Sequence, residues 1–391
     1  MRVGILHNAY RYRGGEERVA EAEARSLEAA GYSVSRLTFD NRVQFASLGS
    51  GLKTALGAAV GWNTQARHRI IDWVRRERLD LVHIHNLFPF ITPSGPDAIA
   101  KLRVPIVMTL HNFRPICATG TLTRGGRPCD ACVCGATGPA IQNRCYRGSM
   151  PQSLAWAAAR KHADRKHLWQ RAITRFIAPS QHVMDTYVRA GFPMDKLTVR
   201  PHFTDINPLD SNERHGAIVV GRVEQAKGIP ELIRCWPPSS TRLTVAGAGP
   251  DLEACKRMAA DNVRFIGHIS QEELATELSR AALLISASQL PETFGLTPIE
   301  AAACRTPTVA FAVGGVATII DHQQTGVLVE PGDFSSLVEH AQSLACSPQQ
   351  ARDLGNAAHH KYLKNYSPEA GLQSLARVYR TAIAPQGRSA A

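Results

Sequence analysis

Short apolar segments rich in Val, Ile and Leu alternate with helical stretches along most of the chain. Their apolar residues are continuous, which is typical of strands buried on both faces of a parallel sheet. The pattern predicts two sets of strands, at 3–6, 33–39, 81–85, 105–110, 176–178 and 197–200, and then at 217–220, 243–246, 263–266, 283–286, 308–311 and 327–329. It predicts helices at 17–30, 65–78, 181–190, 251–260, 271–281 and 368–383.

This alternation predicts an α/β fold, and two sets of about six strands predict two Rossmann-like, doubly wound domains. A polar, turn-forming stretch at 205–214 separates the two sets. We therefore expect an N-terminal domain over 1–207, a second domain over 213–365, and a final segment, 366–391, whose helix packs against either domain. Two such domains would face a cleft at the carboxyl ends of their strands, the usual ligand site in these folds.

The composition of the 391 residues, 44% hydrophobic and 20% charged, is typical of globular proteins and excludes a fibre or a disulfide-stapled miniature. No stretch is apolar enough for a spanning helix, and the N-terminus lacks the apolar core of a signal peptide. We therefore expect a cytoplasmic protein. The net charge of +12 favours anionic partners, such as nucleic acid, anionic lipid or a phosphorylated small molecule.

Positive charge is concentrated between Arg144 and Arg200, where eleven basic residues stand against three acidic ones. Within this region, the stretch 152–176 combines Trp156 and Trp169 with six Lys and Arg residues. It is either a basic helix lying on an anionic membrane or a solvated helix with two aromatic residues that face the core. The first interpretation would place the protein peripherally on the inner face of the membrane.

Two motifs in the second half combine charged groups with glycine. The loop 221–228 follows a predicted strand and carries Arg222 and Lys227 beside a helix start, which suits a diphosphate, although a solvated basic loop has the same composition. Further on, Glu292 and Glu300 lie eight positions apart, with Phe-Gly-Leu-Thr between them. Such carboxylates accept hydrogen bonds from sugar hydroxyls, and the alternative is a pair of surface charges.

Together these motifs resemble the donor site of retaining GT-B glycosyltransferases of family 4. The resemblance includes the loop 221–228, the Glu-x7-Glu motif with Phe-Gly inside it, the Gly-x-Gly-Pro turn at 247–250 and the strand end at 263–268. Order and spacing match from about Ala217 to Glu330. One departure is Arg305, where the family often has glycine.

The resemblance implies that the second domain binds a nucleotide diphosphate sugar. Arg222 and Lys227 would hold the diphosphate, Glu300 would hold the ribose hydroxyls, and Glu292 would contact the sugar hydroxyls. Four further residues would contribute, largely through their backbone: Phe294, Gly295, Leu296 and His268.

The first half carries glycine and histidine after its predicted strands. In the motif that begins at Tyr12, Gly14 and Gly15 allow close approach of a phosphate to a helix N-terminus, or they form an ordinary tight turn. The resemblance implies that these glycines meet the donor phosphates across the cleft. His85 and His111 end two successive strands, where a histidine is often structural. The resemblance implies that His111 is catalytic, together with Glu292, and that His85 shapes the acceptor pocket.

The resemblance also implies retention of configuration by front-face departure and attack, with the leaving phosphate taking the acceptor proton. No enzymic nucleophile is then required, and the task of the protein is to stabilise the charge that develops on the diphosphate. The sequence contains no Asp-x-Asp pair, so we expect no catalytic metal.

Five of the nine cysteines cluster as Cys117-x11-Cys129-x2-Cys132-x-Cys134-x10-Cys145. In a chain without an export signal, we expect reduced thiols. A Cys-x2-Cys turn with two outlying thiols favours a structural zinc site of Cys117, Cys129, Cys132 and Cys145, and iron–sulfur ligation or free buried thiols are the alternatives. The stretch resembles a subgroup of bacterial family 4 enzymes that build cell-surface polysaccharides. A metal here would fix an insertion at about 114–150 beside the acceptor side.

The resemblance therefore implies a retaining hexosyltransferase that uses a nucleotide diphosphate sugar and a glycan or polyprenyl-linked acceptor, and needs no cofactor for catalysis. A GT-B-fold epimerase or phosphorylase and a basic nucleic-acid-binding protein are the alternatives. Aromatic residues make up only 6% and no nucleic-acid-binding module is recognisable, so we expect no nucleic acid partner.

Overall fold

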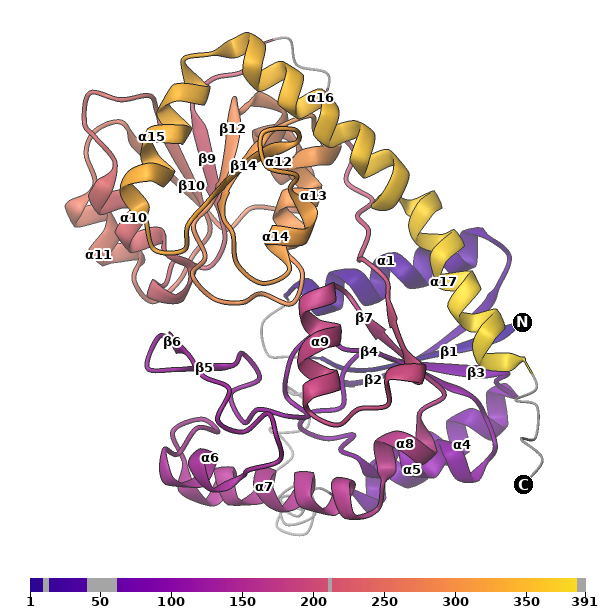
Figure 1. The fold of residues 1–391 in the computed structure, drawn as a ribbon. Helices are drawn as coiled ribbons and strands as arrows, with labels where there is room; N and C mark the ends of the chain where they lie inside the picture. The colour runs from indigo at the N-terminus through magenta and orange to yellow at the C-terminus, as the bar shows by residue number, and fades with distance from the viewer. Residues whose placement is uncertain (10–13, 41–61, 210–212, 385–391) are drawn as a thin grey trace. The chain divides into compact units, whose positions relative to one another are not determined.

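The computed structural model describes residues 1–9, 14–40, 62–209 and 213–384. The chain forms two compact units (Figure 1). The first unit consists of 1–124, 129–200 and 372–391, and the second consists of 125–128 and 201–371. In both units a parallel sheet is covered by helices.

The first unit is built on a six-stranded sheet in the order β2-β1-β3-β4-β7-β8, in which all neighbouring strands are parallel. Its strands are β1 (Arg2–Ala9), β2 (Ser33–Asp40), β3 (Leu81–Ile84), β4 (Ile106–Thr109), β7 (Arg175–Ala178) and β8 (Leu197–Val199). Strands β3 and β4 are fully buried, as their continuous apolar residues predict. The order reverses at β1 and β3, where ligands bind in doubly wound folds.

Helices cover both faces of this sheet. One face packs against α4 (Thr64–Glu77), α5 (Ser94–Lys101), α8 (Leu168–Ala172) and α9 (Gln181–Arg189). The other face packs against α1 (Gly15–Ala29) and the C-terminal part of α17 (Pro368–Ile383). Leu375 and Tyr379 of α17 are fully buried, so the end of the chain completes the core of the first unit.

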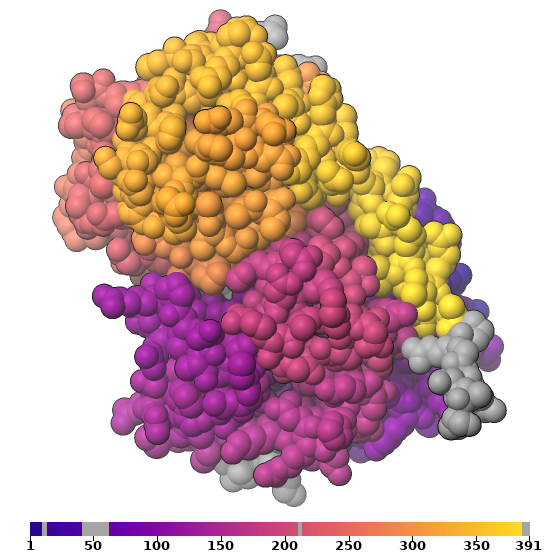
Figure 2. Space-filling view, in the orientation of Figure 1, coloured from indigo at the N-terminus to yellow at the C-terminus, as the bar shows by residue number. Residues whose placement is uncertain are grey.

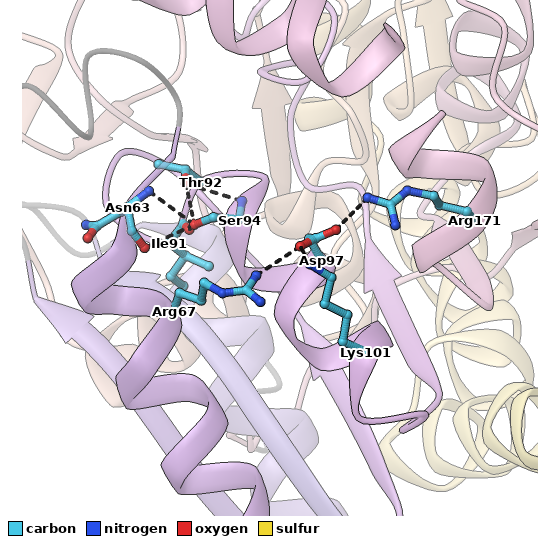
Figure 3. A network of polar contacts seen from close by, with 8 residues as sticks. All are labelled: Asn63, Arg67, Ile91, Thr92, Ser94, Asp97, Lys101 and Arg171. Atoms are coloured by element: carbon cyan, nitrogen blue, oxygen red, sulfur yellow. Dashed lines mark hydrogen bonds and ion pairs between the residues drawn. The ribbon is translucent and has the colours of Figure 1, made fainter. Parts of the chain in front are cut away.

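A buried carboxylate joins three of these helices (Figure 3). Asp97 of α5 is only 1% exposed. Its carboxylate forms ion pairs with Arg67 of α4 at 2.9 Å, with Lys101 at 3.2 Å, and with Arg171 of α8. Burial alone would raise the pKa of Asp97, but the three cations outweigh it and lower the pKa. Beside it, the Ser94 hydroxyl accepts from the backbone N–H of Asn63 at 3.2 Å, which fixes the start of α4. The network ties α4, α5 and α8 together.

The second unit has a six-stranded parallel sheet in the order β11-β10-β9-β12-β13-β14. Its strands are β9 (Ala217–Val220), β10 (Leu243–Ala246), β11 (Val263–Gly267), β12 (Leu283–Ser286), β13 (Thr308–Phe311) and β14 (Gly326–Val329). This is the Rossmann order, and the direction of winding reverses between β9 and β12. The loops that follow these two strands are therefore the expected ligand loops of this unit.

Helices again form two layers. One consists of α10 (Ile229–Cys235), α11 (Leu252–Met258) and α15 (Phe334–Ala345). The other consists of α12 (Gln271–Arg280), α13 (Leu296–Ala303), α14 (Val316–Ile319) and α16 (Pro348–Asn365). Helices α15 and α16, orange to yellow in Figure 2, form much of the visible surface of this unit.

The cysteine-rich stretch has little regular structure. It contains β5 (Thr123–Arg124), β6 (Arg127–Pro128) and α6 (Gly138–Gln142), and it leads into α7 (Met150–Arg165). Trp156 and Trp169 are 4% and 3% exposed, so both aromatic side chains face the core, as one of the two interpretations expected. Among the described residues, no helix combines the length and apolar character needed to cross a bilayer.

The twelve predicted strands and the α/β class are confirmed, with strand ends that differ by up to three residues. The stretch 205–209 has no regular structure, and 210–212 lie outside the described residues, as do Tyr12 and Arg13. Arg305 follows the C-cap of α13 with a φ of 56°. The backbone thus keeps the left-handed conformation that favours glycine, although the residue is arginine.

Candidate active site

Two cations lie on the loop that follows β9. Arg222 is 65% exposed, and its Nε lies 3.2 Å from the Glu224 carboxylate. Lys227 ends a short 3-10 turn, Gln225–Lys227, directly before α10. The loop therefore presents an exposed guanidinium and a positioned ammonium at the carboxyl edge of the sheet.

Lys227 forms an ion pair with Glu292, which lies in the loop that follows β12. Its Nζ donates to Glu292 Oε1 at 2.8 Å, and both side chains are about a quarter to a third exposed (34% and 25%). Burial would lower the pKa of Lys227 and raise that of Glu292, but the opposite charge outweighs burial on both sides, and a hydrogen bond from Ser288 also favours the Glu292 carboxylate. Both groups therefore stay charged over a wide pH range.

A glycine pair that the sequence analysis did not single out supports Glu292. Gly314 has a φ of 57°, and a Cβ on it would lie 2.7 Å from the backbone N and O of Glu292. Gly315 donates its N–H to the Glu292 carbonyl at 2.7 Å. The signal was present in the sequence, because Gly314 and Gly315 follow a strand, as Gly14 and Gly15 do.

Glu300 lies on α13, whose N-cap is Gly295 with a φ of 111°. Its side chain is 2% exposed, and Leu296 forms the first turn of the same helix. Phe294 is also 2% exposed, and its ring packs against His202 and Tyr366 with centroid distances of 5.2 and 6.0 Å. Phe294 can therefore reach a ligand through its backbone but not through its ring.

His268 is exposed directly after β11. The neighbouring loops are closely packed: Gly247 donates to the Gly267 carbonyl at 2.7 Å, and a Cβ on Gly247 would lie 1.8 Å from the Gly221 carbonyl oxygen. Only glycine fits at Gly247. The absence of a side chain lets the loops after β9, β10 and β11 pack closely at their common edge of the sheet.

In the first unit, the structure brings the two predicted histidines together. His85 Nδ1 lies 2.9 Å from His111 Nε2, and the rings stack at a centroid distance of 5.2 Å. Their exposed fractions are 2% and 7%. His85 therefore orients His111 directly, a role that the sequence analysis did not assign.

A buried ion pair lies behind these histidines. Glu23 of α1 forms an ion pair with Arg200, and its other oxygen lies 3.6 Å from His85 Nε2 and 3.5 Å from His83 Nδ1. His83 also contacts the Tyr379 hydroxyl at 2.8 Å. Burial raises the pKa of Glu23, although the charge and hydrogen bond of Arg200 oppose it. Helix α1, the end of β3, the residue after β8 and helix α17 thus share one polar network.

Sequence reasoning missed Glu23 and Arg200. Glu23 lies four residues from both Val19 and Leu27, on the buried stripe of α1, and an acid on such a stripe signals a buried partner. The partner itself is 177 residues away, so no local pattern identifies it.

Gly14 is exposed and caps α1, where its N–H donates to Glu17 at 2.9 Å. Gly15 and Glu16 form the first turn of the helix. Glu16 accepts a hydrogen bond from Asn112 at 2.6 Å, which places it beside the His111 strand end. Burial raises the pKa of Glu16 to about 8, helped by Glu17 and opposed by the Asn112 hydrogen bond and by Arg114.

Two clusters contain potential metal ligands. Glu23, His83 and His85 place one ligand atom each within 4.8 Å of one another, but Arg200 already neutralises the carboxylate. The second cluster is the cysteine group. Cys117, Cys129, Cys132 and Cys145 line one small cavity, and burial raises the pKa of Cys132 and Cys145.

Comparison with known proteins identifies the family. The model for glycosyltransferase family 4 matches residues 13–207, and the model for glycosyl transferases group 1 matches 204–361. The structure of HepE from Anabaena in complex with UDP-glucose has the same fold, with a TM-score of 0.66, 17% identity, and coverage of 97% of this chain and 99% of that one. The chain belongs to the GT-B glycosyltransferases.

Curated relatives of this glycosyltransferase carry several names. Glycogen synthase of Mycobacterium tuberculosis is 31% identical over 175 residues, which is 42% of each chain, so the match spans less than half of that relative. N-acetyl-alpha-D-glucosaminyl L-malate synthase of Bacillus anthracis is 23% identical over 325 residues, or 80% of this chain and 77% of that protein. Because these relatives are named for different products, the substrate has to be inferred from the site of this chain.

Replacement of Glu16 by glutamine should stabilise this glycosyltransferase at high pH. The pKa of Glu16 is 4.5 before folding and about 8 after it, so folding takes up a proton between these values and stability falls as pH rises through them. Glu16→Gln should therefore raise Tm most at pH 8–9, by about 2–4 °C per kcal/mol recovered, and little at pH 5. The measurement is thermal unfolding across this pH range.

The matched control is Glu339→Gln, on the exposed face of α15. Its Tm should follow that of the wild type at every pH. A Glu16→Gln variant whose Tm difference from wild type does not grow between pH 5 and pH 9 would contradict the assignment.

Proposed function

We propose that this chain is a retaining glycosyltransferase that moves a hexose-type sugar from a nucleoside diphosphate sugar to a glycan or lipid-linked acceptor in cell-surface polysaccharide synthesis. The observation that carries the proposal is the Lys227–Glu292 pair, on the two loops that flank the point where the second sheet reverses its winding.

The donor end of the proposal rests on charge. A nucleoside diphosphate needs fixed cations, and the charge on its β-phosphate grows as the glycosidic bond breaks. Lys227 is held in place by Glu292, and Arg222 on the same loop is exposed and able to move toward an anion. Glu292 stays ionised and has a second oxygen that suits sugar hydroxyls, while the buried Glu300 suits the ribose.

UDP is the first nucleotide to test. HepE is described in complexes with UDP and with UDP-glucose, and it shares the fold of this chain across nearly its whole length. In this proposal, the backbone around Gly267 and His268 frames the base, since this strand end packs against the glycine loops that follow β9 and β10.

The first unit would act on the reacting centre through His111. Its Nε2 lies 2.9 Å from His85 Nδ1, so the orientation of the His111 ring is fixed. A histidine held in this way can donate to the leaving phosphate or orient the acceptor hydroxyl. In front-face substitution the departing phosphate oxygen takes the acceptor proton, so no protein nucleophile and no metal enters the scheme.

The acceptor proposal rests on the surface of α7. Met150 and Leu154 are 47% and 56% exposed, and Lys161 and Arg165 continue the same exposed face toward the C-terminus of the helix. An apolar and basic face suits a polyprenyl diphosphate held at an anionic membrane surface. Peripheral location on the cytoplasmic face of the membrane belongs to this part of the proposal.

Lys227→Ala and Glu292→Ala should each abolish transfer, because each removes one half of the donor-binding pair. Both should leave the fold intact, since the two side chains are partly exposed. We expect release of nucleoside diphosphate to fall by about 100-fold or more. The assay measures this release from UDP-glucose, GDP-mannose or ADP-glucose, whichever the wild type turns over, and product NMR checks that the anomeric configuration is retained.

Lys256→Ala is the matched control for this pair of variants. Lys256 forms an exposed 2.9 Å ion pair with Glu253 on α11 of the same unit, so its loss should leave turnover unchanged. Turnover like that of the wild type in a folded Lys227→Ala or Glu292→Ala variant would overturn the site assignment.

His85 should act through His111. We expect His111→Ala to lower kcat by about 100-fold and His85→Ala to lower it by about tenfold. Because the two side chains are hydrogen-bonded, the double variant should be no slower than His111→Ala alone. Independent, additive losses would show that His85 does not position His111; circular dichroism of each variant checks that all are folded.

A further inference from the structure

The four predicted cysteine ligands lie around one cavity in the first unit. Cys117, Cys129, Cys132 and Cys145 all line a space of about 20 Å³. Its other lining residues carry no carboxylate and no histidine: they are Ala118, Thr119, Leu122, Thr123, Arg124, Ala131, Pro139 and Ala140. Four thiols from three separate stretches of the chain thus converge on a space that holds about one water-sized sphere.

The fifth cysteine of the cluster does not belong to this group. Cys134 is exposed, and its sulfur lies 3.9 Å from the Arg189 carbonyl, away from the cavity lining. The cavity is therefore lined by four of the five clustered cysteines: the two of the Cys-x2-Cys turn and the two outlying ones.

The backbone around the cavity is held by a buried arginine. Arg160 of α7 is 5% exposed and donates to the carbonyls of Ile116 and Cys132 at 2.6 Å and of Val133 at 3.0 Å. It therefore ties the residue before Cys117 to the Cys-x2-Cys turn. Arg160 thus holds two of the cysteine-bearing stretches in place, so the site is organised before any ion enters.

The hydrophobic core beneath the insertion is small. Its buried members are Ala118, Ala140, Trp156 and Ala157. Irregular segments with so little buried apolar surface are commonly held by disulfides or metals. All of the cysteines are free thiols in this structure, so no disulfide supplies the constraint.

A single tetrahedral ion fits better than an iron–sulfur cluster. A four-iron cluster needs far more room than about 20 Å³, whereas zinc accepts four thiolates and requires nothing else. Among the described residues, these sulfurs do not form a group within 4.8 Å of one another, compared with the spacing of about 3.8 Å that Zn–S bonds of 2.3 Å impose. An ion would therefore draw the three stretches inward.

We propose that Cys117, Cys129, Cys132 and Cys145 bind one Zn²⁺ as thiolates and that this ion holds the insertion together. Binding releases the thiol protons to solvent, and the ion undergoes no redox change. The role of this ion is structural. Its test does not depend on the transferase proposal, because the experiment measures metal content and not turnover.

The first experiment measures the metal content of the full chain, expressed with zinc and purified under reducing conditions without chelator. Mass spectrometry should find about one Zn per chain in the wild type and in Cys134→Ser, and less than about 0.2 in Cys132→Ser. Cys134 is the matched control because it belongs to the same cluster but not to the cavity lining.

A second measurement covers the case in which Cys132→Ser does not fold. Wild-type protein stripped with a chelator should lose thermal stability and regain it with Zn²⁺ alone. The stripped protein should bind Co²⁺ with the intense visible absorption of thiolate ligation, saturating at one equivalent and bleached by Zn²⁺.

Three results would overturn the proposal. The first is a reduced, folded wild type that contains no zinc and takes up no Co²⁺. The second is iron with inorganic sulfide in place of zinc. The third is a disulfide between any two of the four cysteines in protein isolated without reductant, detected by mass spectrometry of its peptides.

Discussion

The parallel direction of every strand pair in the two large sheets is the constraint on which the site depends. In each unit all carboxyl ends lie at one edge, so residues that follow a strand gather there regardless of their distance in the sequence. Adjacent strands β9 and β12 send their connections to opposite sides, and Lys227 and Glu292 form their ion pair between the loops that follow these two strands. Gly314 and Gly247 keep the neighbouring loops close enough to support the pair.

The first unit depends on a buried charge pair instead. Glu23 and Arg200 are 0% and 1% exposed, and removing one partner of such a pair leaves an uncompensated charge in the core. The pair lies directly behind His83 and His85, and through His85 it reaches His111. Tyr379 contacts His83 in the same network, so the last helix helps to support histidines from the first third of the chain.

Local patterns predicted the strands and the loops that carry Lys227 and Glu292, because each depends on a few consecutive residues. The contacts could not be predicted in the same way. Glu23 meets a partner 177 residues away, and the burial of Trp156 depends on which face of α7 packs inward. The Lys227–Glu292 contact required the strand order as well as both motifs.

The central claim is that the second unit binds a nucleoside diphosphate through Lys227. Thermal unfolding of the full chain with UDP, GDP and ADP tests it most directly, since a ligand that binds only the folded state stabilises it by about 2.7 kcal/mol at a hundredfold excess over Kd. The account predicts a rise in Tm with one of the three, and no rise with that nucleotide in Lys227→Ala. No shift with any nucleotide in a folded wild type would contradict it.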